Sequence, residues 1–223
     1  MPMASYFGFL PSQQLSNDID VALAKAAANS GEALYPYRDK VVKAINDELV
    51  NATLIDMVDM LPDSDRKKSL HKHAQTIQDT SGKLLNQLLG KADNKEVLDS
   101  VEFMHKSLST DPNGQRRTGF VLPDDLASRL KAIFAAIAAG DVEGQRKALT
   151  HDMKQFADLA LNNYMTEFNK TLHLGMIKRG AASVAHSVIE KVLHLVINSL
   201  IPSLSDEEVK RFAAHYDQLI YRS

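Results

Sequence analysis

Apolar residues recur at spacings of three and four along most of this chain, which is the pattern of helices with one buried face. Proline, glycine and helix-capping residues fall at the edges of these periodic segments. The pattern predicts seven or eight helices, at about 17–30, 36–61, 64–90, 93–108, 123–139, 141–175, 177–200 and 205–223. Strand signals and repeats of a fixed period are absent from the sequence, so we predict an all-α fold.

Two of the predicted helix starts carry capping signals. Asp93 precedes Glu96 by three residues, and Ser205 precedes Glu208 by the same spacing. Side chains at this spacing satisfy the free backbone N–H groups of a first helical turn. The segment 109–122 contains Asp, Pro, Asn and Gly in succession and lacks a helical period, so we predict an exposed loop there.

The sixth predicted helix carries the longest apolar line. Its members are Leu149, Met153, Phe156, Ala160, Tyr164, Phe168 and Leu172. A helix of this length is longer than one globular core usually covers. We therefore expect part of the line to face another subunit, which predicts a homodimer through 141–174.

Composition limits the function classes. Apolar residues make up 44% of the chain and charged residues 24%, as in ordinary globular proteins. The formal net charge is −2, so we expect no overall field that holds nucleic acid or an anionic membrane. The chain has no cysteine, which excludes disulfides and thiolate metal sites and fits a reducing compartment. Because 1–10 also lacks the basic region of a secretory signal, we expect a cytoplasmic location.

The most apolar stretch, 184–201, contains His186, Glu190, Lys191 and His194. These polar interruptions predict an amphipathic helix rather than a membrane span. The two histidines and Glu190 share one side of that helix with serine and lysine, which predicts a solvated face rather than a metal site. The densest basic run, 66–73, has acidic neighbours and no interleaved aromatic residues, so nucleic-acid binding is not expected.

Enzyme motifs have little support. Glycine-rich phosphate motifs and the serine elbow motif are missing, so we predict no enzyme. His151 and Asp152 form the dipeptide of helical His-Asp phosphohydrolases, but roughly 0.7 such dipeptides are expected by chance at this composition. Glu102 and His105 have the Glu-x-x-His spacing of di-iron bundles, which requires a second copy of the motif that this sequence lacks.

The order of several segments resembles the sensor globins, that is, the globin domains of globin-coupled sensors and the related protoglobins. The resemblance extends over about 34–172. It is carried by LYPYRDKVV from Leu34, LLNQLLG from Leu84, VEFMH ending at His105, LPDDL from Leu122, and the helix 151–164. The second of these segments is similar to the end of the distal helix of that family, and the third is similar to the short helix with the proximal histidine.

The resemblance implies a heme b cofactor. Heme requires an axial imidazole nitrogen and a flat cavity lined by apolar side chains. By the resemblance, His105 supplies the proximal bond to the heme iron, and Phe103, Met104 and Leu108 lie beside it. Asn46 takes the distal position at which relatives often carry a tyrosine, so His71, His73 and Gln75 are further distal candidates.

The resemblance also implies an organisation and a function. Residues 12–174 are expected to form a globin-like bundle that senses or binds oxygen or another diatomic gas. Residues 175–223 are expected to form a C-terminal helical extension that packs on this domain or on a partner subunit. Related sensors dimerise through their last two globin helices, in agreement with a homodimer through 141–174, and a downstream protein partner would receive the signal.

Two function classes stay open at the level of sequence. The first is heme-based gas sensing or binding. The second is a heme-free, all-helical regulatory or protein-interaction module, because some relatives of this fold have no heme. A metal-dependent His-Asp phosphohydrolase is a third alternative.

Overall fold

A computed structural model describes residues 4–28 and 31–223, and the chain is 74% helical. Eight continuous helices lie in this part of the chain, which confirms the all-α prediction. Six of them are α1 (Gln13–Ala28), α4 (Asp65–Leu88), α5 (Asn94–Lys106), α6 (Asp124–Ala138), α9 (Met176–Ser203) and α10 (Asp206–Asp217). The seventh is α2 (Tyr35–Val50), which continues through the π-helical η1 (Asn51–Ile55) into α3 (Asp56–Asp59). The eighth is α7 (Val142–Leu161), which continues through the π-helical η2 (Asn162–Glu167) into α8 (Phe168–Lys170).

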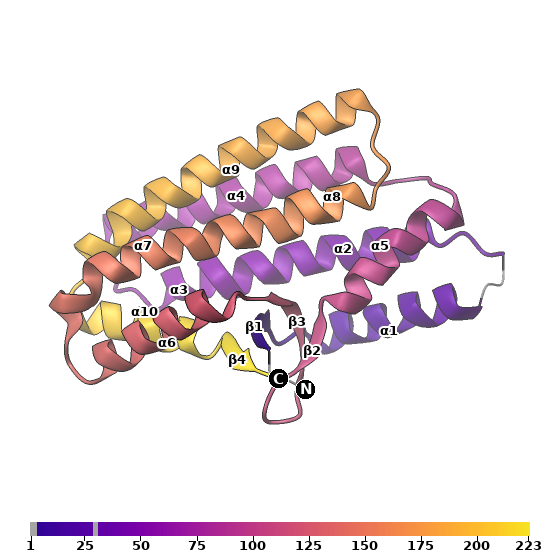
Figure 1. The fold of residues 1–223 in the computed structure, drawn as a ribbon. Helices are drawn as coiled ribbons and strands as arrows, with labels where there is room; N and C mark the ends of the chain where they lie inside the picture. Colours follow the sequence, from indigo (N-terminus) through magenta and orange to yellow (C-terminus); the bar gives the residue numbers. More distant parts are fainter. Residues whose placement is uncertain (1–3, 29–30) are drawn as a thin grey trace.

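The long helices α9, α4, α7 and α2 run side by side and form the bundle (Figure 1). α9 packs on α7 and α4, and α4 packs on α2. α1 and α5 pack on α2, whereas α6 and α10 pack on each other and on α7. The expected extension 175–223 therefore packs on the preceding helices as part of one core, in which Val196, Leu200 and Ile201 are members.

The capping signals act as the sequence indicates. The Asp93 carboxylate accepts a hydrogen bond from the Glu96 backbone N–H at 2.9 Å. The Ser205 hydroxyl accepts from the Glu208 N–H at 3.3 Å, and the Glu208 carboxylate accepts from the Ser205 N–H at 2.7 Å. The first helix begins at Gln13 rather than near 17, because the hydroxyl of Ser12 caps it. Its expected end at residue 30 lies outside the described residues.

A small antiparallel sheet was not expected from the sequence. Its strands are β1 (Ser5–Phe9), β2 (Leu108–Thr110), β3 (Arg116–Val121) and β4 (Ile220–Arg222), in the order β2-β3-β1-β4. The prediction of an exposed loop at 109–122 is wrong, because β2 and β3 form a hairpin there. The prediction that the last helix reaches the terminus is also wrong, because α10 ends at Asp217.

The sheet joins both ends of the described chain to the bundle (Figure 1). Phe7 of β1 pairs with Phe120 of β3 on one side and with Ile220 of β4 on the other. The Phe7 ring lies 5.3 Å from that of Phe120 and 4.9 Å from that of Phe156 on α7. One face of the sheet is therefore part of the core.

The first residues of the longest apolar line of the sequence also lie inside the bundle. Leu149, Met153 and Phe156 of α7 are at most 5% exposed. They pack within the chain, whereas Ala160, Tyr164 and Leu172 of the same line are half-buried, and a homodimer through 141–174 stays a prediction. Among the described helices, only α9 is long and apolar enough to cross a membrane by length and composition. Since α9 packs on α4 and α7, it is a helix of the bundle.

Candidate functional site: two adjoining apolar cavities

Two cavities lie within the bundle, and they share part of their walls. The first has a volume of about 70 Å³ and is enclosed by α2, α4, α5 and η2–α8. The second has a volume of about 120 Å³ and is enclosed by α2–η1–α3, α4, α7–η2, α9 and α10. The residues common to both walls are Asn46, Leu49, Ser81, Tyr164 and Met165.

The π-helical segments explain why the bundle is not filled at this level. A π-helical turn holds more residues than an α-helical turn, so the following side chains are rotated relative to a regular helix. η1 brings Thr53 and Leu54 to the second cavity, and η2 brings Tyr164 and Met165 to both cavities. π-Helical turns of this kind occur often at functional sites.

Apolar space of this size is costly when nothing fills it. At about 24 cal/mol per Å³, a cavity of about 120 Å³ costs about 3 kcal/mol of folding free energy. Protein interiors normally hold few voids larger than a water molecule. A ligand that fills the space with apolar atoms would recover that free energy.

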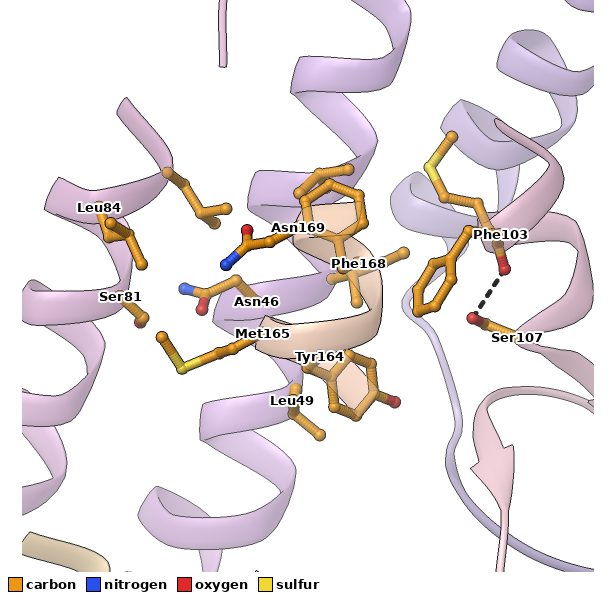
Figure 2. Close-up of a pocket in the computed structure, with 14 residues that line it drawn as sticks. Asn46, Leu49, Ser81, Leu84, Phe103, Ser107, Tyr164, Met165, Phe168 and Asn169 are labelled. Carbon is orange, nitrogen blue, oxygen red and sulfur yellow. Dashed lines mark hydrogen bonds between the residues drawn. The ribbon is translucent and has the colours of Figure 1, made fainter. Parts of the chain in front are cut away.

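A few polar groups face the otherwise apolar walls. The Asn46 and Asn169 amides lie close together at the first cavity, with Ser81 on the neighbouring helix (Figure 2). Ser81 donates its hydroxyl hydrogen to the Gln78 carbonyl at 3.1 Å, and Asn46 donates to the Asp47 carboxylate at 3.2 Å. Both amide oxygens lack a donor among the described residues, so this side of the cavity can bind a polar group.

Tyr164 lines both cavities. The residue as a whole is half-buried, but its hydroxyl oxygen is buried and has no hydrogen-bond partner among the described residues. Burial raises the pKa of this phenol well above its ordinary value, so the group stays protonated. A buried donor without a partner costs about 1–3 kcal/mol.

An open groove adjoins the cavities on the side of α8. It has a volume of about 380 Å³ and lies between η2–α8 and α9. Met165 lines the groove and both cavities, and Asn169 lines the groove and the first cavity. Lys170, Arg179 and His186 also line the groove, so its charged groups are basic.

The structure brings three of the five expected heme-pocket residues together. Asn46, Phe103 and Met104 all line the first cavity. Leu108 is half-buried on β2 and lines neither cavity. His105 is exposed, because it lies about 100° around α5 from the buried Met104.

The residues present do not fit a heme held through His105. Of the described histidines, none lines either cavity, and the same holds for the distal candidates His71, His73 and Gln75. The first cavity, at about 70 Å³, is smaller than a cavity of about 150 Å³ that accommodates a single benzene. Heme ligation by His105 stays a prediction for experiment.

The other histidine motifs form ordinary polar contacts. Glu102 pairs with Lys106 at 2.6 Å, not with His105. Asp152 is buried and pairs with Arg129 at 3.0 Å, whereas His151 is exposed. In the described part of the chain, no three acidic or histidine side chains converge in a way that could hold a metal ion.

His194 and His186, which the sequence places on one solvated side of α9, lie in different surroundings. His194 contacts Asp158 of α7 at 2.6 Å, and His186 lines the groove. Both side chains are half-buried.

Sequence reasoning missed several residues of the cavity walls, two of which, Met165 and Asn169, also line the groove. Tyr164 was assigned to an apolar line, and Met165, Asn169 and Ser81 carried no signal, because a π-helical turn has no clear sequence pattern. Comparisons with protein-family models, curated proteins and solved structures found no match to this chain. The function is therefore argued from the site itself.

Proposed function

We propose that this chain is a heme-independent helical module that binds an amphiphile with an apolar tail and an anionic head. The observation that carries the proposal is the pair of adjoining apolar cavities, which share a wall with a basic surface groove at Met165. Ligand sites are typically apolar concavities with a few polar groups that fix the orientation of the ligand.

The second cavity suits the tail. Its wall contains Ile77, Leu161, Ile189 and Val196, which are all buried, together with the aromatic rings of Phe156 and others. Met165 stands between this cavity and the groove. Methionine is unbranched and flexible, so a change of its rotamer is an inexpensive way to join the two spaces.

The groove suits an anionic head. Arg179 is exposed and has no ion-pair partner among the described residues, and Lys170 pairs with Glu167 at 2.7 Å. A guanidinium group binds a carboxylate or a phosphate through two parallel N–H donors. The amides of Asn46 and Asn169 lie between the head and the tail.

The test is a titration with six-carbon amphiphiles that differ only in the head group, because cavities of about 120 and 70 Å³ accept only a short tail. We expect hexanoate to raise the melting temperature in a concentration-dependent way, hexanol to act less strongly, and hexylamine to act least, because bound ligand stabilises the folded state. Native mass spectrometry of the same samples gives the stoichiometry, which we expect to be one ligand per chain.

A cavity-filling variant links the effect to this site. Ala157 lines the second cavity on α7 and is 6% exposed, so Ala157→Leu would occupy the space of the tail. We expect it to weaken hexanoate binding at least tenfold and to raise the melting temperature of the free protein. The exposed Ala148 on the same helix gives the matched control Ala148→Leu. Undiminished binding by Ala157→Leu, or no binding by the wild type, would overturn the proposal.

The cellular location belongs to the same proposal. We place the protein in the cytoplasm, since the chain contains no cysteine and no disulfide is needed to hold the fold.

A further inference from the structure

The outer side of α9 carries a line of exposed apolar residues. Ile177 is 90% exposed, Val184 67%, Val188 43% and Leu195 57%. A helix advances about 100° per residue, so these four side chains lie within about 20° of one line along the helix. The line is about 27 Å long at about 1.5 Å per residue.

The width of the line indicates what covers it. A helix that buries one side against a broad apolar environment shows an apolar face at least about 100° wide, whereas a helix pair needs only a narrow seam. Ser187 and Lys191 border the line on one side of α9. On its other side, Ala181, Ala185 and Val192 are half-buried and already pack within the bundle, so the exposed apolar line is narrow. The narrow seam therefore favours a second helix over a lipid surface.

The spacing of the apolar residues indicates which helix covers the line. The steps from Ile177 to Val184, to Val188 and to Leu195 are seven, four and seven residues, so the line reads the same in both directions about position 186. A two-fold axis at that position would place Ile177 opposite Leu195 of a second copy, and Val184 opposite Val188. Such self-complementarity is what a symmetric dimer interface requires.

The charge nearest the line is compatible with the same axis. Lys191 lies about 40° from the line, and the axis places it opposite the half-buried Ala181 of the second copy. The two copies of Lys191 would be about 15 Å apart along the helices, so they do not repel each other closely. The small alanine leaves room for the lysine stem.

We infer that α9 pairs with α9 of a second copy, antiparallel and centred near His186. The contact consists mainly of one helix pair, so it lies at the low end of interface sizes, and we expect a dissociation constant on the order of 1 μM. This dimer uses a different surface from 141–174 and does not depend on the amphiphile proposed above.

Cysteine cross-linking tests the register, because the natural chain has no cysteine. We expect a mixture of Ile177→Cys and Leu195→Cys proteins to give a disulfide-linked dimer under mild oxidation. Each variant alone should give at least tenfold less disulfide-linked dimer. In the antiparallel register, the two copies of the same residue are about 27 Å apart, which is too far for a disulfide. The exposed Ala148→Cys, on another helix, is the control for random collisions.

The mass of the protein in solution tests the same dimer independently. Light scattering of the wild type should change from monomer to dimer mass between about 0.1 and 100 μM. Val188→Asp should remain monomeric with unchanged circular dichroism. The inference would be overturned if each single cysteine variant cross-linked with itself as well as the mixture does. It would also be overturned if the wild type were monomeric at 100 μM. Wild-type protein that stays monomeric but floats with phosphatidylserine vesicles, and loses this with Val188→Asp, would assign α9 to a membrane surface instead.

Discussion

Tyr164 has the most unusual surroundings of the cavity residues. Its ring packs against Phe120 with centroids 5.8 Å apart, and its hydroxyl is buried without a partner among the described residues. Tyr216, by contrast, donates its hydroxyl hydrogen to the Thr53 carbonyl at 2.6 Å on the second cavity wall. The two tyrosines, whose hydroxyl groups are both buried, thus differ in a single hydrogen bond, and the unpaired one lines both cavities.

Tyr164→Phe removes this unpaired hydroxyl. We expect the free energy of unfolding of the free protein to rise by about 1 kcal/mol, because a buried polar atom without a partner is destabilising. Tyr216→Phe is the matched control and should lower that free energy, since it removes the hydrogen bond to the Thr53 carbonyl. Urea unfolding followed by circular dichroism measures both, and a loss of stability in Tyr164→Phe would show that the hydroxyl has a partner in solution.

An experiment on His105 distinguishes the proposed heme-independent module from a heme-binding globin. Because His105 is exposed and outside both cavities, we expect hemin titration to give no stoichiometric Soret band that depends on it. Wild type and His105→Ala should have the same absorption spectra. A band that shifts with carbon monoxide after reduction and is lost in His105→Ala would support heme ligation and contradict the heme-independent module.

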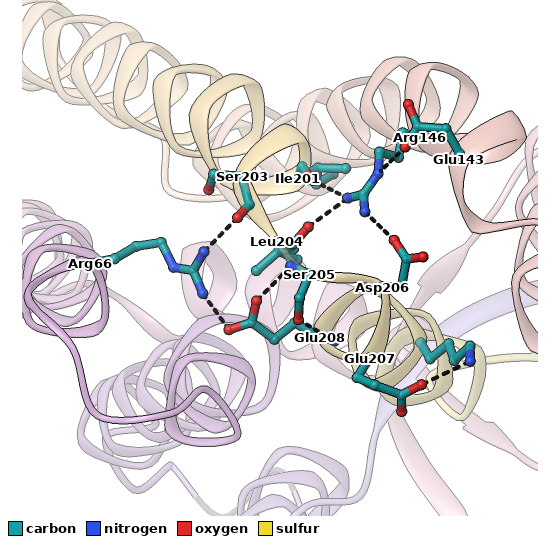
Figure 3. A network of polar contacts seen from close by, with 11 residues as sticks. Arg66, Glu143, Arg146, Ile201, Ser203, Leu204, Ser205, Asp206, Glu207 and Glu208 are labelled. Carbon is teal, nitrogen blue, oxygen red and sulfur yellow. Dashed lines mark hydrogen bonds and ion pairs between the residues drawn. The ribbon is translucent and has the colours of Figure 1, made fainter.

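At the scale of elements, two arginines hold the end of α9 (Figure 3). Arg146 of α7 donates to the carbonyls of Ile201 and Leu204 at 3.1 and 2.8 Å and to the Asp206 carboxylate at 2.6 Å. Arg66 of α4 donates to the Ser203 carbonyl at 2.6 Å and pairs with Glu208. The free carbonyls at the end of α9 are thereby satisfied by side chains of two other helices.

Glu208 makes this connection sensitive to pH. Burial alone would raise its pKa, but the Ser205 backbone and hydroxyl and the Arg66 guanidinium outweigh burial, so the pKa is lowered from its ordinary value. A lowered pKa in the folded state gives stability that is present above about pH 4.3 and is lost as the pH falls. We expect Glu208→Gln to lower the free energy of unfolding by about 1–3 kcal/mol at pH 7.

The difference between wild type and Glu208→Gln should shrink below about pH 4. The exposed Glu207, which pairs with Lys210 at 2.9 Å, gives the control Glu207→Gln, whose effect should be under about 1 kcal/mol. Urea unfolding at several pH values measures both variants. A deficit in Glu208→Gln that is constant from pH 3 to 8 would mean that the carboxylate charge is not involved.

The helices were predictable because their signals are local. Apolar spacing, Asp93 and the Ser205–Glu208 box lie within a few residues of the structure that they specify. The sheet was not predictable, because β1 pairs with strands more than 100 residues away and β2 and β4 have three residues each. For the site, the globin resemblance placed Phe103 and Met104 at a pocket, and both line the first cavity, but the fold alone decides that His105 faces solvent.

At the scale of the whole molecule, one core connects the sheet, the bundle and the last two helices. Its members include Phe7 of β1, Leu149 of α7, Ile201 of α9 and Val209 of α10, each at most 1% exposed. The backbones of Ala4 and Ser223 exchange two hydrogen bonds of 3.1 Å, so both ends of the described chain meet at the sheet. A single core predicts that the parts unfold together.

Phe7→Ala tests this cooperativity, because β1 and α9 lie far apart in the sequence. Its side chain is fully buried against Phe120 and Phe156, so we expect a loss of about 3–5 kcal/mol in the free energy of unfolding. Val121→Ala, at a position of the same sheet that is 58% exposed, should cost under about 1 kcal/mol. If the core is one unit, helix content and tyrosine fluorescence of Phe7→Ala will decrease in one coincident transition at a lower urea concentration. Two separate transitions, with one unchanged from the wild type, would instead show that 175–223 unfolds independently of 12–174, as an appended extension would.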